Sequence, residues 1–486
     1  MACPPIVAPE TVASISGEHV GSKADPATWQ PARLIPTAGI KGAREQEQRA
    51  TSALLSVMKA VPEFGRELVG DLGAPKGKRT KLSTYVEVFL DDGSGGTVRP
   101  DGAIIADSGK RRWSALVEVK TGSNQSNTEQ VLKYVDAAIR EGFDGVLIID
   151  NNILGGADDV PIEVPKNKLR KVQVWQLSWW RIVTEAILQH DYRGVSDPDQ
   201  AWILSELIAY LSHESSGVAE LGDMGPSWVK VRDGARHNAL NKRQSEVGEI
   251  ARRWEQFVHW VALGFTQETG VDVTPERVKT DLGERIEETK HELVDRGVLS
   301  MRLRIPDAVG PLSLTADLRA QMVTTSVSIK APGEGRPDTR VRWILRQLKD
   351  APDDLRIETK FVGLKRTTAV LLGEAREDEK KVLLPDDQKR EPREFHLSLA
   401  RPMGTKRGSG QGGFISETHQ QAIDFYRELF QQLTPWRPKA PKLREKSTEA
   451  KPAPEKQQPK PAWEAPPTLD PNEASGFRAP PPAGHQ

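Results

Sequence analysis

The sequence contains a single cysteine, Cys3, among 486 residues. An intrachain disulfide and a metal cluster built from cysteines are therefore excluded. No apolar run approaches the roughly 18 residues that a membrane-spanning helix needs. The N-terminal stretch MACPPIVAPETVASIS lacks the basic flank and apolar core of a secretory signal. These absences predict a soluble, cytoplasmic protein that has no membrane partner.

Net charge is also absent, because 68 Lys and Arg residues balance 68 Asp and Glu residues. This balance excludes a uniformly basic, chromatin-type binder but is compatible with a local basic groove. Hydrophobic residues make up 37% of the chain, which is enough for sizeable cores. The length suits two to three domains.

Composition and patterning divide the chain into four parts. Residues 1–40 are rich in Pro, Ala, Gly and Ser and predict a flexible lead-in. Residues 437–486 are dominated by Pro, Lys, Glu and Ala and predict a disordered tail. Residues 41–236 predict an α/β domain, a mixed sheet flanked by helices with a helical extension, whereas 237–436 predict an α+β accessory domain.

Apolar periodicity gives the expected elements of the first domain. Strands are expected over 84–90, 102–105, 114–120, 145–150 and 171–177. Helices are expected over 44–61, 127–142, 178–190 and 197–213. Asn127 and Asp197 are expected N-caps, and Gly142 ends its helix. Twelve Trp residues invite a base-stacking interpretation. Trp202, however, follows an apolar helix face and is expected in the core.

The stretch RPDGAIIADSGKRRWSALVEVKTG, residues 99–122, contains the candidate chemistry. Asp101 begins one expected strand, and Glu118 and Lys120 lie two apart on the next, so these two share a face. If the strands pair as a hairpin, two carboxylates converge beside one ammonium group. Such a set suits Mg²⁺, which prefers oxygen ligands and, when bound, activates water for phosphodiester hydrolysis. Each motif alone is also typical of an ordinary turn or of a solvated strand face.

Pro100-Asp101 and Glu118-Val119-Lys120 resemble the motif of the PD-(D/E)xK nuclease superfamily. Gln130 and Tyr134 form Q-x-x-x-Y on the next helix, which is similar to RecB-like members. The resemblance covers about residues 41–190. It implies a restriction-endonuclease-like fold and metal-dependent cleavage of nucleic acid, with DNA as the expected substrate, in genome defence or repair.

The resemblance also implies roles for individual residues. Asp101, Glu118 and Lys120 would be catalytic. Mg²⁺, or alternatively Mn²⁺, would be held by Asp101, Glu118, the Val119 carbonyl and an upstream glutamate. Glu47 is preferred to Glu45 for this last role, because Glu47 shares the helix face that includes Ala50, Leu54 and Val61.

Further residues are candidates for binding nucleic acid. The basic loop 74–81 contains Lys76, Lys78, Arg79 and Lys81, which could follow a phosphate backbone or simply be solvated. Thr121, Gln130 and Tyr134 are near the expected site in sequence, and core packing is the alternative for Tyr134. Two further functional hypotheses stay open: a catalytically silent module that binds DNA or a protein partner, and a scaffold whose tail recruits a protein. A homodimer is also compatible with the sequence.

Overall fold

The structure is a computed structural model of the chain. The structure describes residues 29–31, 43–122, 124, 126–155, 157, 159–160, 162–213, 216–218, 221–276, 281–408 and 410–438. The expected lead-in, 1–40, and the expected tail, 437–486, lie outside these residues except for 29–31 and 437–438. The chain up to Pro438 forms one compact unit.

The first sheet is mixed, as the sequence predicted. Its strands follow the order β1-β2-β5-β6-β7-β8, with antiparallel pairing from β1 to β6 and parallel pairing from β6 to β8. Their bounds are β1 (Gln30–Pro31), β2 (Lys81–Val86), β5 (Gly102–Asp107), β6 (Arg112–Val119), β7 (Gly145–Asp150) and β8 (Gln173–Ser178).

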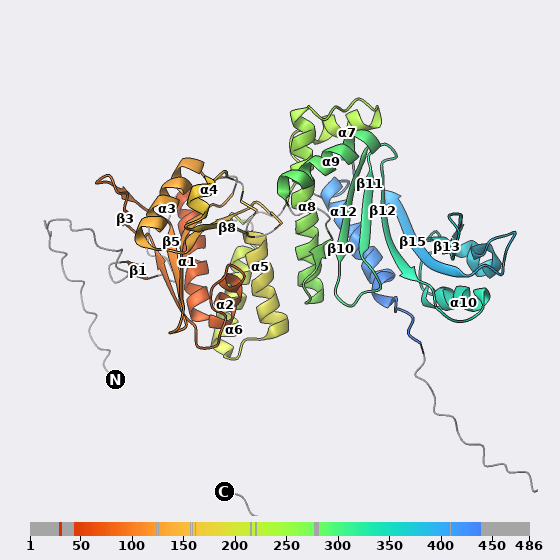
Figure 1. The fold of residues 1–486 in the computed structure, drawn as a ribbon, viewed down its shortest axis with the longest axis horizontal. Coiled ribbons are helices and arrows are strands. Elements are labelled where there is room, and N and C mark those ends of the chain that lie inside the picture. The colour runs from red at the N-terminus through yellow and green to blue at the C-terminus, as the bar shows by residue number, and fades with distance from the viewer. Residues whose placement is uncertain are drawn as a thin grey trace, which may run out of the picture. The chain divides into compact units, whose positions relative to one another are not determined.

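Helices cover both faces of this sheet (Figure 1). They are α1 (Ala43–Ala60), α2 (Pro62–Gly70), α3 (Thr128–Glu141), α4 (Lys166–Leu169), α5 (Trp179–Ile187), the π-helical η2 (Leu188–Arg193) and α6 (Pro198–Leu211). Val117 and Val119 are buried on the face that packs with α1, α2, α5 and α6. Leu116 is buried on the other face, with α3. The alternation along β6 therefore directs Glu118 away from the core that contains Val117 and Val119.

The helix ends confirm the capping signals. The Asn127 side chain accepts hydrogen bonds from the backbone N–H groups of Glu129 and Gln130 at the start of α3, and Gly142 ends the helix with φ 79°. Asp197 caps α6 in the same way.

Two expectations for this domain are wrong. The run 84–90 is not one strand, because the chain turns at Glu87, which has φ 52°. Beyond this turn, β3 (Leu90–Asp91) and β4 (Thr97–Val98) form a separate two-stranded hairpin. Trp202 is not in the core, since 63% of it is exposed.

The second sheet is antiparallel, in the order β14-β13-β15-β12-β11-β10-β9. Its strands are β9 (Thr274–Pro275), β10 (Val298–Arg304), β11 (Leu312–Asp317), β12 (Met322–Lys330), β13 (Arg356–Phe361), β14 (Thr367–Leu371) and β15 (Pro392–Pro402). Its helices are α7 (Trp228–Arg236), α8 (Ser245–Thr269), α9 (Leu282–Arg296), α10 (Pro337–Gln347), α11 (Leu372–Glu377), α12 (Phe414–Glu428) and the short 3₁₀ turns η4 (Glu379–Val382) and η5 (Phe430–Gln432).

The core under the second sheet includes α7. Trp228 is fully buried there, with its ring centroid 4.3 Å from that of Phe414. The sequence pattern assigned residues 228–236 to the first domain. Their buried side chains instead pack in the core of the second sheet.

No helix in the described part of the chain combines the length and apolarity needed to cross a bilayer.

Candidate active site

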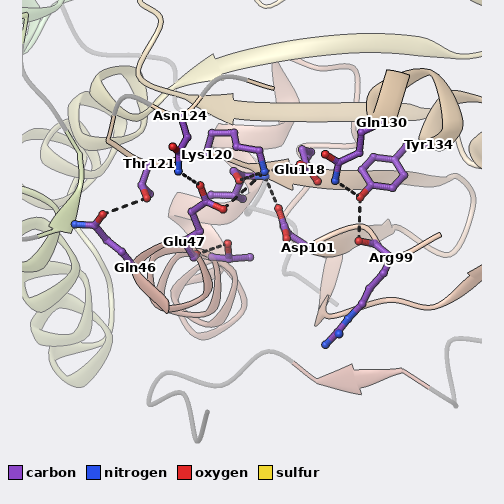
Figure 2. Close-up of polar contacts among 12 residues, drawn as sticks. Gln46, Glu47, Arg99, Asp101, Glu118, Lys120, Thr121, Asn124, Gln130 and Tyr134 are labelled. Carbon is purple, nitrogen blue, oxygen red and sulfur yellow. Dashed lines mark hydrogen bonds and ion pairs between the residues drawn. The ribbon is translucent and has the colours of Figure 1, made fainter. Parts of the chain in front are cut away.

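The pairing of β5 with β6 brings the three predicted catalytic residues to one edge of the first sheet. Gly102 pairs with Val117, so Asp101, just before β5, lies next to Glu118. Figure 2 shows Asp101, Glu118 and Lys120 directed toward one another. Oδ2 of Asp101 accepts a hydrogen bond of 2.8 Å from the Val119 N–H, and Nζ of Lys120 lies 2.6 Å from Oε1 of Glu118. The structure therefore brings together the groups that the motif contains.

Glu118 is the most deeply buried of the three, with 1% of its surface exposed. Burial, followed by the charge of Asp101, raises the pKa of Glu118 to about 8. Burial also raises the pKa of Asp101, although the hydrogen bond from the Val119 amide opposes this shift. Two carboxylates that share one poorly solvated space favour a bound cation or a retained proton.

Lys120 extends from the end of β6 toward the N-terminal part of α1. Burial by itself lowers the pKa of Lys120, but the neighbouring carboxylates, Glu118 first, outweigh it and raise the pKa above its usual value. Nζ also lies 3.7 Å from Oε2 of Glu47 and donates a 3.1 Å hydrogen bond to the Val119 carbonyl. The ammonium group is thus held charged among carboxylates.

Glu47 reaches the site from α1, on the helix face that the apolar phase indicated. Nδ2 of Asn124 donates a 2.8 Å hydrogen bond to Oε1 of Glu47. Glu45, the rejected alternative, forms an ion pair with Arg49 one turn along the helix. The geometry thus distinguishes the two glutamates.

Hydrogen bonds of Gln130 and Tyr134 connect α3 to the segment just before Asp101. Nε2 of Gln130 donates to Oη of Tyr134 at 2.7 Å, and Oη donates to the Arg99 carbonyl at 3.0 Å. Tyr134 is 3% exposed and belongs to the α3 core. Both residues therefore support the segment before Asp101, and Tyr134 also packs in the core.

Several contacts at the site were not predicted from the sequence. The hydroxyl of Thr121 lies 3.5 Å from Oε1 of Gln46, and Nε1 of Trp179 donates to the Lys120 carbonyl at 2.9 Å. Nδ2 of Asn151 donates to the carbonyls of Gly122 and Gly217. These contacts fix the end of β6 on both sides. Since they join segments far apart in the chain, no local sequence pattern indicates them.

The basic loop does not belong to this site. Because β2 runs antiparallel to β5, Lys81 pairs with Asp107, at the far end of β5 from Asp101. Six residues of strand separate these ends, which is about 20 Å. Lys76 is moreover paired with Glu67 and Asp71, while Lys78 and Arg79 are exposed. The loop that ends at Lys81 therefore enters the sheet at the end far from Asp101. The binding of nucleic acid by Lys76, Lys78, Arg79 and Lys81 stays a prediction.

The oxygen atoms at this site are the possible ligands of the expected Mg²⁺. Within the described ranges, no three His, Cys, Asp or Glu side chains are grouped to hold a metal ion. Asp101 and Glu118 nevertheless suit a small hard cation, because Oε2 of buried Glu118 has no hydrogen-bond partner and Oε1 is paired with the Lys120 ammonium group. Mg²⁺ is commonly held by one or two carboxylates plus water and substrate phosphate. Two carboxylates and the Val119 carbonyl therefore fit the ion, with Glu47 near Lys120 as a further oxygen donor.

Comparisons of the chain with protein-family models, with curated proteins and with solved structures found no match.

Proposed function

We propose that the chain is a metal-dependent nuclease of the PD-(D/E)xK type, with a restriction-endonuclease-like first domain. The observation that carries this proposal is the convergence of Asp101, Glu118 and Lys120 at one sheet edge. DNA is the expected substrate, and genome defence or repair the expected setting.

The chain's own residues have distinct roles in this proposal. Asp101 and Glu118 would hold Mg²⁺ or Mn²⁺ together with the Val119 carbonyl, and the bound metal would supply Lewis acidity toward a phosphate and lower the pKa of a water. Lys120 orients the attacking water and stabilises negative charge that develops on the phosphate. Glu47 positions the Lys120 ammonium from α1. The Tyr134 hydroxyl holds the backbone of Arg99 and thereby the strand that presents Asp101.

The test is cleavage of DNA by the purified protein with Mg²⁺ or Mn²⁺. Lys120→Ala should lower the cleavage rate by about 100-fold or more, because the removed charge acts on the transition state. Lys110→Ala is the matched control, since Lys110 is an exposed lysine on the turn between β5 and β6, away from Asp101. It should keep the wild-type rate.

Cleavage that survives both Lys120→Ala and Asp101→Ala would contradict the proposal. Tight DNA binding without cleavage under either metal, and unchanged by Asp101→Asn, would instead support the silent binding module. Circular dichroism of each variant checks that the fold is intact.

A further inference from the structure

A large apolar side chain lies exposed close to the candidate active site. Phe89 has 58% of its surface exposed. The guanidinium carbon of Arg99 lies 4.8 Å from the centre of the Phe89 ring, in a cation–π arrangement. We call Phe89 and Arg99 the stacking pair.

Backbone hydrogen bonds join the segment that contains Phe89 to the segment that contains Asp101. The N–H of Glu87 bonds to the Asp101 carbonyl, and the N–H of Val88 bonds to the Pro100 carbonyl. Leu90 pairs with Val98, so Phe89 and Arg99 lie opposite one another between these contacts. Arg99 is two residues from Asp101, which corresponds to at most about 7 Å of extended chain.

Alternation along the hairpin puts the stacking pair on the face away from α3. Val88 and Leu90 are buried in the core that contains α3, so Phe89, between them, points the other way. Arg99 on this face pairs with Glu87 at 2.5 Å, and Nε2 of Gln48 on α1 donates to Oε1 of Glu87 at 3.1 Å.

Gln48 follows Glu47, whose carboxylate lies 3.7 Å from Lys120 Nζ. Contacts therefore run continuously from the catalytic ammonium group, along the start of α1, to the stacking pair. We expect the nucleotides next to a phosphate bound at Asp101 and Glu118 to follow this line of contacts.

Stability does not account for the exposed ring. Phe89 does not belong to either core of the first domain. Glu87 already pairs with the Arg99 guanidinium group, so Arg99 does not depend on the ring for a partner. An aromatic face beside an arginine is, however, the arrangement on which unpaired bases stack, and it accepts any base because every base has a π-face.

We propose that the stacking pair binds one unpaired base of the nucleic acid, within a nucleotide or two of the cleaved bond. This inference rests on the proposed nuclease function and specifies its substrate as single-stranded at that position. In a duplex the same base must first leave its stack, which a single strand does not require.

The experiment measures binding of short, fluorescently labelled single-stranded and duplex DNA to the full chain in EDTA, followed by cleavage with Mg²⁺. Phe89→Ala should weaken single-strand binding about 5- to 100-fold, which corresponds to the loss of one stacked base. Phe89→Tyr should restore it. Trp202→Ala is the matched control, because Trp202 is another exposed aromatic, on α6, and its removal should leave binding unchanged.

A second measurement locates the stacked base. 2-Aminopurine, placed in turn at each position beside the cleaved bond, should lose fluorescence at one position in the wild type and in Trp202→Ala, but not in Phe89→Ala.

The outcomes separate the two proposals. If the wild type binds and cleaves DNA while Phe89→Ala behaves like the wild type, or if duplex binds as tightly as single strand, the stacking inference is overturned and the nuclease assignment stands. If the wild type neither binds nor cleaves any DNA, both are overturned.

Discussion

Glu118 shows how one buried side chain links stability to pH. Its pKa rises to about 8 through burial and the charge of Asp101, whereas the unfolded chain has the ordinary value near 4.5. Between these values the folded protein keeps a proton that the unfolded chain has released. Its contribution to stability is therefore complete below about pH 4.5 and is lost as the pH rises through about 8.

The Glu118→Gln variant should consequently lose this pH dependence in the metal-free protein. In EDTA, the free energy of unfolding of the wild type should fall between pH 5 and pH 9 by more than that of Glu118→Gln, by an amount on the order of a few kcal/mol. Urea denaturation of both proteins at the two pH values measures the difference. Equal decreases in the two proteins would contradict the assignment of a buried, protonated Glu118.

The types and spacing of individual residues predicted part of the site and missed the rest. Asp101, Glu118 and Lys120 could be found because a strand of period two fixes which side chains share a face. Glu47 could be distinguished from Glu45 because helical periodicity determines which side chains share a face of α1. Asn124 and Trp179 could not, since their contacts with the site depend on how distant segments pack.

Helix α3 begins and ends at residues whose types favour helix ends. The Asn127 side chain satisfies backbone N–H groups of the first turn, and Gly142 takes the left-handed conformation that ends the helix. Because these signals are local, the bounds of α3 could be predicted from the sequence.

Asn127→Ala should lower the free energy of unfolding by about 1 kcal/mol, because it leaves helix N–H groups without their acceptor. Urea denaturation measures the change. The control is Lys133→Ala on the same helix, where an exposed side chain is removed and the change should stay within about 0.5 kcal/mol. Equal effects of the two substitutions would show that the cap contributes nothing.

Two errors at the level of helices and strands have physical causes. The apolar run 84–90 suits a continuous strand, but Glu87 has a positive φ. A positive φ is uncommon for a residue other than glycine, so the sequence did not indicate a turn at this position. Helix α6 has apolar residues on several faces, so phase alone could not show that Leu204, Leu207 and Leu211 are buried while Trp202 is exposed.

The two large sheets of the described chain each have their own packed side chains, and the boundary between these two regions was the least predictable feature. Trp228 follows a loop and has no periodic context in the sequence, yet it is fully buried under the second sheet. The register of β2 against β5, which puts Lys81 opposite Asp107 and away from Asp101, was also not predicted.

The composition change near residue 437, by contrast, coincides with the end of the compact unit at Pro438. A chain that ends at Pro438 should keep the thermal unfolding midpoint and the DNA cleavage rate of the full chain, because the described helices, strands and core residues all precede that point. Differential scanning calorimetry and the cleavage assay check this. A lower midpoint would show that residues 439–486 stabilise the unit, and lost cleavage would show that they contribute to cleavage. The scaffold hypothesis instead predicts that the shortened chain keeps any nuclease activity and loses its protein partner.

The left-handed turn at Glu87 has a consequence for engineering. Beyond it, Val88, Leu90 and Val98 anchor the small hairpin through their buried side chains, while the intervening positions face outward. A library that keeps these three buried residues and randomises the outward-facing positions would yield variants of the hairpin with different exposed surfaces. Substrate preference could then be reshaped without redesigning the sheet that supports the acidic groups.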